Sequence, residues 1–218
     1  MAMPVGPSPR LEYLSDFLKF KQWAKEHLKH CPTLPRREEL YAYLNKEILA
    51  DAPVDYLEFG VYQGDSIGKW LTLNHAPTSR FFGFDTFEGL PEDWWNYKLT
   101  MKKGMFDVGG QTPSLDDKRV QFIKGLFQDS LPKFLESFSP NSRLVIHLDA
   151  DLYSSTLYVL TKMDHLIRPG TLLLFDEFNG VNHEFRALMD YLISYRREIK
   201  PLAVAGPFYN HVAVEVNK

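Results

Sequence analysis

The sequence predicts an α/β fold whose centre is a mostly parallel sheet of seven strands. Five short, nearly continuous apolar runs alternate with amphipathic stretches of helical period. This alternation is typical of right-handed strand–helix–strand units. Two more strand-like runs follow each other near the C-terminal end with no helix between them, and a helical region precedes the first run.

The N-terminal region is predicted to hold two helices. Apolar side chains recur at helical spacing from Leu11 to Leu28, with charged residues between them. Cys31–Pro35 interrupts this pattern, and a second helix is expected over Arg37–Leu49. We therefore expect a helical cap segment, residues 1–50, and a larger domain, residues 51–218. The aromatic side chains of the first helix fit either a cover over the functional site or a contact in a homo-oligomer.

Each of the five apolar runs is short and rich in Phe, Val, Ile or Leu, which is typical of strands buried on both faces. The predicted strands are Tyr56–Val61, Arg80–Asp85, Val120–Lys124, Leu144–Asp149 and Thr171–Asp176. The predicted helices are Ser66–Leu73, Gln128–Phe138, Ser154–Ile167 and His183–Arg197. The last two runs, Pro201–Ala205 and His211–Val216, should pair antiparallel. A parallel sheet that ends in such a hairpin is typical of class I methyltransferases, an analogy that concerns the fold alone.

Composition excludes several classes of protein. The apolar fraction of 44% supports a packed core, and the net charge of −3 gives no reason to expect nucleic acid or an anionic membrane as a partner. The single cysteine, Cys31, allows neither a disulfide framework nor a cysteine-based zinc site. No signal-like or membrane-spanning apolar run is present. We therefore expect a cytoplasmic protein that acts on a small molecule.

The segment from Tyr56 to Ser66 is the first candidate site, because a buried strand ends in two glycines before a helix begins. Gly60 and Gly64 lack a Cβ and would let the backbone approach a ligand at the carboxyl end of the strand. Glu58 is a carboxylate inside an apolar strand and needs a cation or donors. The ammonium group of a ligand would serve. The alternative is a tight turn in which Glu58 pairs with a Lys or Arg.

Two further segments complete a candidate nucleotide site. Asp85 ends the second predicted strand, 25 positions after Gly60, near the offset expected of an acid that binds a ribose diol, and Thr86 follows it. The alternative for Asp85 is a helix N-cap. Phe127 and Gln128 follow the third strand, where they could pack on adenine and bond its amino group. A plain strand-to-helix junction capped by Asp129 is the alternative there.

A third group of acids follows the fourth and fifth predicted strands. Asp149, Asp176 and Glu177 should converge, and three neighbouring carboxylates repel unless a cation bridges them. Oxygen ligands suit Mg²⁺, so we expect a metal site, with capping of the following helices as the alternative. Asp151 is either a supporting acceptor or a helix N-cap.

Two histidines and one long connection lie near these acids. His183 could act as a general base, whereas His147 is expected to be buried with its ring nitrogens satisfied. The connection Pro91–Lys118 fits no helix or strand and contains Trp94, Trp95 and Phe106. A connection of this length inside a domain is typical of a lid.

Five blocks of the sequence together resemble the macrocin O-methyltransferase-like family, whose members methylate sugar hydroxyls of macrolide antibiotics. The blocks are YLEFGVYQGDS, FFGFDTFEGLPEDW, IKGLFQDSLPKF, HLDADLYSSTLYVL and LLLFDEFNG. They span Asp55 to Glu184 in the expected order. The resemblance implies a Rossmann-like fold, S-adenosylmethionine as donor, and Mg²⁺ held by Asp149, Asp176 and Glu177. Members usually carry Asp-Asp where this chain has Asp176-Glu177, and a glutamate is one methylene longer.

We therefore expect an S-adenosylmethionine-dependent methyltransferase that methylates a hydroxyl of a small molecule or sugar with help from a metal ion. Glu58, Gly60, Gly64, Ser66 and Asp85 belong to the expected donor site, with Asp149 at the reacting centre. An NAD-dependent oxidoreductase would normally show G-x-G-x-x-G after the first strand, and this chain has Tyr62 at the middle position. A non-catalytic nucleotide-binding protein would not need three converging acids.

Overall fold

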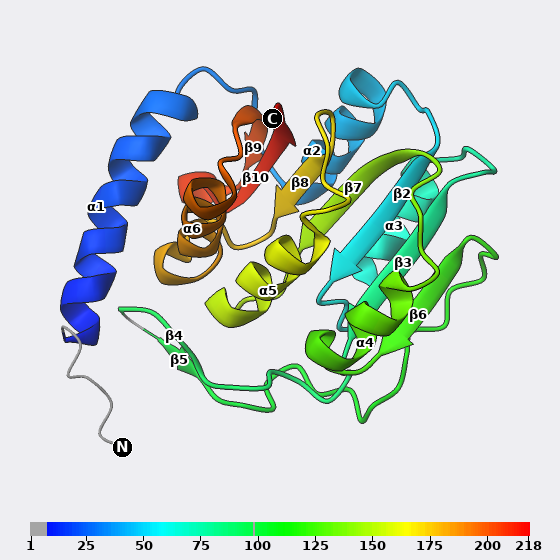
Figure 1. The fold of residues 1–218 in the computed structure, drawn as a ribbon, viewed down its shortest axis with the longest axis horizontal. Helices are drawn as coiled ribbons and strands as arrows, with labels where there is room; N and C mark the ends of the chain where they lie inside the picture. Colours follow the sequence, from blue (N-terminus) through cyan, green and yellow to red (C-terminus); the bar gives the residue numbers. More distant parts are fainter. Residues whose placement is uncertain (1–7, 98) are drawn as a thin grey trace.

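The computed structural model describes residues 8–97 and 99–218, and an eight-stranded mixed sheet forms its centre (Figure 1). The strand order is β1-β9-β10-β8-β7-β2-β3-β6. The strands are β1 (Thr33–Leu34), β2 (Val54–Phe59), β3 (Arg80–Asp85), β6 (Val120–Lys124), β7 (Arg143–Leu148), β8 (Leu172–Phe175), β9 (Ile199–Ala205) and β10 (His211–Val216). Strands β2, β3, β6, β7 and β8 run parallel, and β10 pairs antiparallel with β8 and β9.

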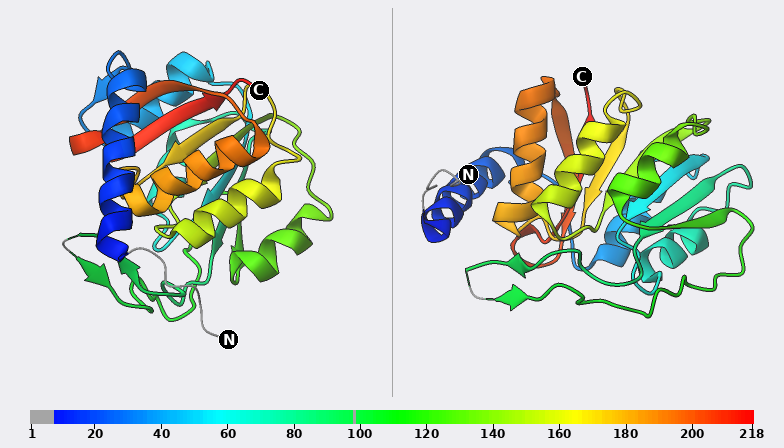
Figure 2. Two further views of the ribbon diagram at one scale, coloured as in Figure 1. Left: turned by 60° about the vertical axis from the view of Figure 1, so that its left-hand side comes forward. Right: turned by 60° about the horizontal axis from the view of Figure 1, so that its bottom comes forward.

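Helices cover both faces of the sheet (Figure 2). The helices are α1 (Pro9–His27), α2 (Arg37–Tyr43), η1 (Leu44–Ile48), α3 (Asp65–Leu73), α4 (Phe127–Leu135), α5 (Tyr153–Met163), η2 (Val181–Phe185), α6 (Arg186–Tyr195) and the turn η3 (Pro207–Tyr209). One apolar cluster joins α1, α4, α5 and α6 to one face, for example through Phe20, Val159 and Leu188. A second joins α2 and α3 to the other face through Leu40 and Trp70. The α/β prediction is therefore confirmed.

All seven predicted strands are present, but the sheet contains one strand more than predicted. Thr33–Leu34, which we had placed in the break between two helices, forms β1 and pairs parallel with β9. A strand of two residues has no period that a sequence pattern could reveal. It ties the N-terminal region to the edge of the sheet.

The second predicted helix also differs in detail, because its last turn is the π-helix η1. The Asn45 amide donates to the Asp51 carboxylate at 2.6 Å and to the Leu73 carbonyl at 3.1 Å. Asn74 donates in turn to the Asn45 side chain at 2.8 Å. These contacts with a distant segment outweigh the local preference for a regular α-helix.

The long connection between β3 and β6 contains a small hairpin of β4 (Trp94–Trp95) and β5 (Thr100–Met101). This lid hairpin lies beside the N-terminal end of α1, where the ring of Tyr13 is 6.4 Å from that of Trp95 (Figure 1). None of the helices in the described part of the chain is both long enough and apolar enough to span a membrane.

Candidate active site

The carboxyl ends of β2, β3, β7 and β8 border one cavity of about 280 Å³. Parallel strands present their carboxyl ends at one edge of a sheet, so residues far apart in sequence meet there. Residues of this cavity that the sequence predicted are Gly60, Asp85, Thr86, Phe127, Gln128, Asp149, Asp176 and Glu177. Arg37, Tyr62, Phe106 and Asp151 also line it. Glu58, Gly64 and Ser66 do not.

Gly60 ends β2 in a conformation that only glycine adopts without strain, with φ at 97°. A Cβ on this residue would lie 1.7 Å from the carbonyl oxygen of Asp149. The missing side chain therefore allows the ends of β2 and β7 to meet, in addition to leaving the cavity open. Gly64 has another role, because a Cβ there would lie 3.0 Å from Pro113 of the connection between β3 and β6.

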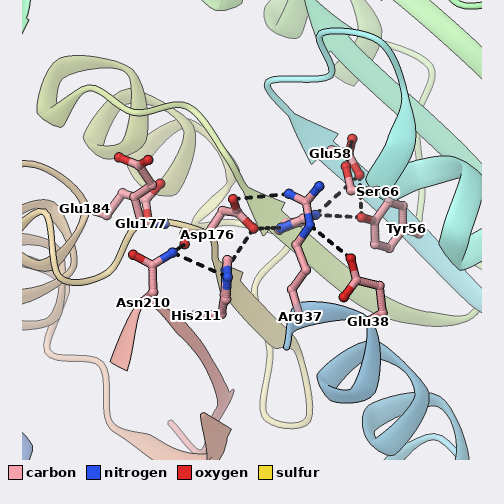
Figure 3. Close-up of polar contacts among 11 residues, drawn as sticks. Arg37, Glu38, Tyr56, Glu58, Ser66, Asp176, Glu177, Glu184, Asn210 and His211 are labelled. Atoms are coloured by element: carbon pink, nitrogen blue, oxygen red, sulfur yellow. Dashed lines mark hydrogen bonds and ion pairs between the residues drawn. The ribbon is translucent and has the colours of Figure 1, made fainter. Parts of the chain in front are cut away.

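Glu58 lies behind the cavity, fully buried, and its partners are internal (Figure 3). The Tyr56 hydroxyl donates to Glu58 Oε2 at 2.5 Å and the Ser66 hydroxyl to Oε1 at 2.7 Å. His147 Nδ1 lies 3.3 Å from Oε2. The geometry therefore does not support the expectation that Glu58 and Ser66 touch a ligand, and a histidine satisfies the carboxylate in place of the Lys or Arg of the alternative.

Asp85 organises the loops around the cavity. Its Oδ2 accepts the N–H groups of Val61 and Tyr62 at 2.8 Å each, and its Oδ1 accepts the N–H of Phe87 at 2.8 Å. No helix begins after Asp85, so the N-cap alternative is wrong. The Thr86 hydroxyl lies 3.5 Å from Oδ1, but its single proton has a closer acceptor in the Gly89 carbonyl at 3.1 Å. Of the about four acceptor positions of a carboxylate, one is therefore left for a ligand hydroxyl.

Asp149 and Asp176 form the acidic centre of the cavity. Oxygens of these two carboxylates and a ring nitrogen of His147 all lie within 4.8 Å of one another. Burial and the neighbouring Asp176 raise the pKa of Asp149 well above its usual value. Within the described chain, no hydrogen bond to the Asp149 carboxylate is found, so its oxygens are available to a ligand.

Nitrogen-bearing side chains from distant parts of the chain surround Asp176, which sequence reasoning did not anticipate. His211 Nδ1 lies 3.0 Å from Oδ1, and Arg37 Nη1 lies 3.5 Å from Oδ2. Burial acts to raise the pKa of Asp176, but His147 and His211 hold it well below the usual range. Burial acts to lower the pKa of His147, whereas Asp176 and Glu58 raise it to about 10. His147 is therefore a buried cation that links Glu58 to Asp176.

Glu177 lines the cavity, but its carboxylate oxygens do not belong to the close group of possible ligand atoms that includes Asp149 and Asp176. Burial and Asp176 raise its pKa. Its neighbour Asp151 has φ at 58°, and burial and Glu177 raise the Asp151 pKa to about 8. Helix α5 begins after Leu152 with no side-chain cap, so the capping alternatives for Asp149 and Asp151 are wrong.

His183 does not line the cavity, and both of its ring nitrogens are engaged. Nε2 lies 2.8 Å from the Trp95 carbonyl, and the Tyr153 N–H donates to Nδ1 at 3.3 Å. The ring also stacks on Trp94 at a centroid distance of 5.3 Å. This geometry fits a positioning role for the lid hairpin and leaves no free nitrogen for the predicted proton transfer.

Comparison with known proteins shows the family of this chain. The family model described as macrocin-O-methyltransferase (TylF) matches residues 34–202. The chain belongs to the macrocin O-methyltransferase family. A relative from Streptomyces olivaceus, 8-demethyl-8-(2,3-dimethoxy-α-L-rhamnosyl)-tetracenomycin-C 4′-O-methyltransferase, is 29% identical over 199 residues, which cover 82% of this chain and 74% of the relative.

Solved O-methyltransferases share the fold of this family member. The calicheamicin methyltransferase CalS11 superimposes with a TM-score of 0.61 at 20% identity, covering 99% of each chain. The O-methyltransferase NovP gives a TM-score of 0.60 at 19% identity, covering 84% of this chain and 80% of NovP. The macrocin O-methyltransferase family member described here is thus an S-adenosylmethionine-dependent O-methyltransferase with the class I fold.

The cavity of this O-methyltransferase fits S-adenosylmethionine by the chemistry of its lining. Polar and aromatic side chains at β3 and α4 (Asp85, Gln128 and Phe127) suit an adenosine, and Gly60 leaves room beside the Asp149 carboxylate. Three residues of the site were not predicted from the sequence: Arg37, Tyr62 and His211. Arg37 lies in the first turn of a helix, a position without a motif, so no local signal could have revealed it.

Proposed function

We propose that this enzyme transfers the methyl group of S-adenosylmethionine to a hydroxyl group of a sugar carried by a small molecule. The observation that supports it best is one cavity in which adenosine-type lining at β3 and α4 meets the acids Asp149 and Asp176. The activity of the Streptomyces olivaceus relative, a 4′-O-methylation of a rhamnosyl tetracenomycin, supports a sugar hydroxyl as acceptor.

The donor would lie along the strand ends from β6 to β7. Phe127 and Gln128 would contact the adenine, Asp85 would accept a ribose hydroxyl at its remaining acceptor position, and Asp149 would accept the ammonium group. Gly60 lies between the residues expected to bind the ribose and the ammonium group. Because it has no side chain, the donor would be able to cross the end of β2. Three residues outside the cavity lining would stabilise the loops that hold the donor: Glu58, Gly64 and Ser66.

The reaction would be an in-line displacement at the methyl carbon. The acceptor oxygen forms a bond to that carbon as the carbon–sulfur bond breaks, and the bonding pair returns to the sulfur. The sulfonium carries its own activation, so the protein mainly orients the reactants. The Asp149 carboxylate has no hydrogen-bond partner in the described chain. One of its oxygens would orient the acceptor hydroxyl and take its proton, while the other faces the ammonium group of the donor.

The carboxylates also fit a divalent cation, since Asp149 and Asp176 come from adjacent strands with oxygens within 4.8 Å. Asp176 Oδ1 is buried, and the ring nitrogens of His211 and His147 lie 3.0 Å and 3.9 Å from it. We propose that Asp149 and Asp176 would hold Mg²⁺, with Glu177 as a third ligand after a rotation of its side chain, because its oxygens lie outside the present group of ligand atoms. When bound, such an ion supplies positive charge that lowers the pKa of a nearby hydroxyl.

The acceptor would lie between the acids and the connection Pro91–Lys118. Leu90, Pro91 and Phe106 line the cavity from this connection, and the lid hairpin is held by His183 and by Asn182, which donates to the Trp95 carbonyl at 2.9 Å. The N-terminal segment contributes α1, whose Tyr13 packs on Trp95. We propose that α1 and the hairpin together cover the acceptor.

Isothermal titration with S-adenosylmethionine, S-adenosylhomocysteine and NAD tests the donor. We expect micromolar binding of both adenosyl ligands and no detectable binding of NAD. Absence of binding of either adenosyl ligand at millimolar concentration would refute the proposed function.

The metal proposal has a separate test, in which turnover is measured with and without Mg²⁺. Asp176→Asn should lower Mg²⁺-dependent turnover by at least about 100-fold, because it removes a charged ligand, while donor affinity stays within about threefold. The control Asp116→Asn, at an exposed position that does not line the cavity, should behave like the wild type. Unchanged turnover in Asp176→Asn would exclude a metal role for this residue.

A further inference from the structure

Arg37 is the only cationic side chain that lines the cavity among the described residues. It comes from the first turn of α2 and reaches Asp176, as Figure 3 shows. Both of its ion pairs are long, with Nη1 at 3.5 Å from Asp176 Oδ2 and Nε at 3.7 Å from Glu38 Oε1. A guanidinium has five N–H donors, so Arg37 keeps donors for a ligand anion.

Tyr41 lies one helical turn after Arg37 and faces the same group of acids. Its side chain is buried, and its hydroxyl has no hydrogen-bond partner in the described chain. Its ring stands edge-on to His147 at a centroid distance of 5.6 Å. Tyr41 itself does not line the cavity, so of these two side chains of α2 only the Arg37 guanidinium is presented to it.

The methionine part of the donor carries two opposite charges that must be matched at this end of the cavity. Its ammonium group fits the surplus of acids around Asp149. Its carboxylate would be repelled by Asp149 and Asp176 unless a cation lies next to it. An arginine binds a carboxylate through two parallel hydrogen bonds, which a lysine cannot reproduce.

We infer that Arg37 binds the carboxylate of the methionine moiety of S-adenosylmethionine. This inference rests on the proposed position of the donor. If Arg37 binds this carboxylate, the N-terminal cap segment contributes to donor binding as well as covering the proposed acceptor region. Such a role also distinguishes Arg37 from Arg36, which is exposed and paired with Glu39 through a hydrogen bond of 3.0 Å from Nε.

The test compares two ligands that differ only in this carboxylate, S-adenosylhomocysteine and its decarboxylated analogue. Wild-type protein should bind the complete ligand about 10- to 100-fold more tightly, the range expected for hydrogen bonds between charged groups. Arg37→Gln should lose most of this preference by weakening only the complete ligand. Arg37→Lys should keep part of it. Arg36→Gln, the matched control, should bind both ligands as the wild type does.

Three outcomes would overturn the inference. Equal weakening of both ligands in Arg37→Gln, with an unchanged urea unfolding midpoint, would mean that Arg37 only supports the site. If Arg37→Gln binds both ligands as the wild type does but has a raised KM for the acceptor, the guanidinium binds an anionic group of the acceptor instead. A wild-type protein that binds the two ligands equally well would show that the carboxylate has no partner. Failure of the wild type to bind either ligand would instead refute the proposed function as well.

Discussion

At the scale of the residue, missing or buried atoms decide the shape of the cavity. Gly60 is required by the carbonyl oxygen of Asp149, a main-chain atom that cannot rotate away. Asp85 uses three backbone N–H groups to hold the loops after β2 and β3 in place. Glu58 and His147 form a buried ion pair that keeps the strand ends together without touching the cavity.

Gly60→Ala should therefore destabilise the protein far more than another glycine of the same backbone conformation. Gly170 has φ at 93°, close to the 97° of Gly60, but a Cβ there would meet no atom within 4 Å. We expect Gly170→Ala to lower the free energy of unfolding by about 1–2 kcal/mol through backbone strain alone. Gly60→Ala should cost at least about 3 kcal/mol because a steric clash is added. Urea unfolding measures both, and equal losses would contradict the steric argument.

At the scale of the element, α1 and the lid hairpin both pack against η2. Phe20 of α1 packs edge-on against Phe185 at 5.2 Å, and Trp94 of the hairpin stacks on His183. Helix α1 contacts η2 more than any other element. A movement of η2 would therefore move both covers of the acceptor region together.

The histidine that holds the hairpin should make this docking depend on pH. Burial lowers the pKa of His183 below its usual value, because Nδ1 accepts a backbone N–H and a charged ring would lose solvation. The stability that neutral His183 contributes is present above its unfolded pKa of about 6.5, and it is lost as pH falls through the lower folded value. His183→Gln should show a smaller loss of unfolding free energy between pH 8 and pH 5.5 than the wild type.

The control for this pH effect is His165→Gln, at an exposed position. It should retain the pH dependence of the wild type in urea unfolding. If His183→Gln also retains the full pH dependence, His183 is not the residue responsible.

At the scale of the whole molecule, the cavity joins the two halves of the sheet. Its lining comes from β2, β3, β7 and β8 and from α2 and the connection between β3 and β6. Main-chain contacts also hold the ends of β2 and β7 together, since the Asp149 N–H donates to the Phe59 carbonyl at 2.9 Å. A donor bound across these ends would connect elements from most of the chain.

Donor binding should therefore stabilise the fold globally. At a ligand concentration of 100 times Kd, S-adenosylhomocysteine should raise the free energy of unfolding by about 2.7 kcal/mol, as linkage requires for a ligand that binds only the folded protein. Hydrogen exchange should slow in β2, β3 and β7 together. Protection confined to the connection Pro91–Lys118 would mean that the ligand only orders the lid.

The fold was largely predictable because its signals are local. A buried strand of five or six residues and an amphipathic helix each show their period within a short window of sequence. The five parallel strands therefore lie within two residues of their predicted bounds. Strand β1 and the π-helix η1 have no such signal. Strand β1 forms through its pairing with β9, and η1 is stabilised by the hydrogen bond from Asn74 to Asn45.

The sequence by itself determined which residues reach the carboxyl edge of the sheet, because a residue at the end of a parallel strand must lie there. Asp85, Asp149 and Asp176 could be placed in this way. Only the tertiary structure decided what each of them meets. Arg37 and Asp176 are 139 positions apart, and His147 lies 89 positions from Glu58. Pairing of buried charges depends on distances in space, and distances of this kind leave no periodic trace in the sequence.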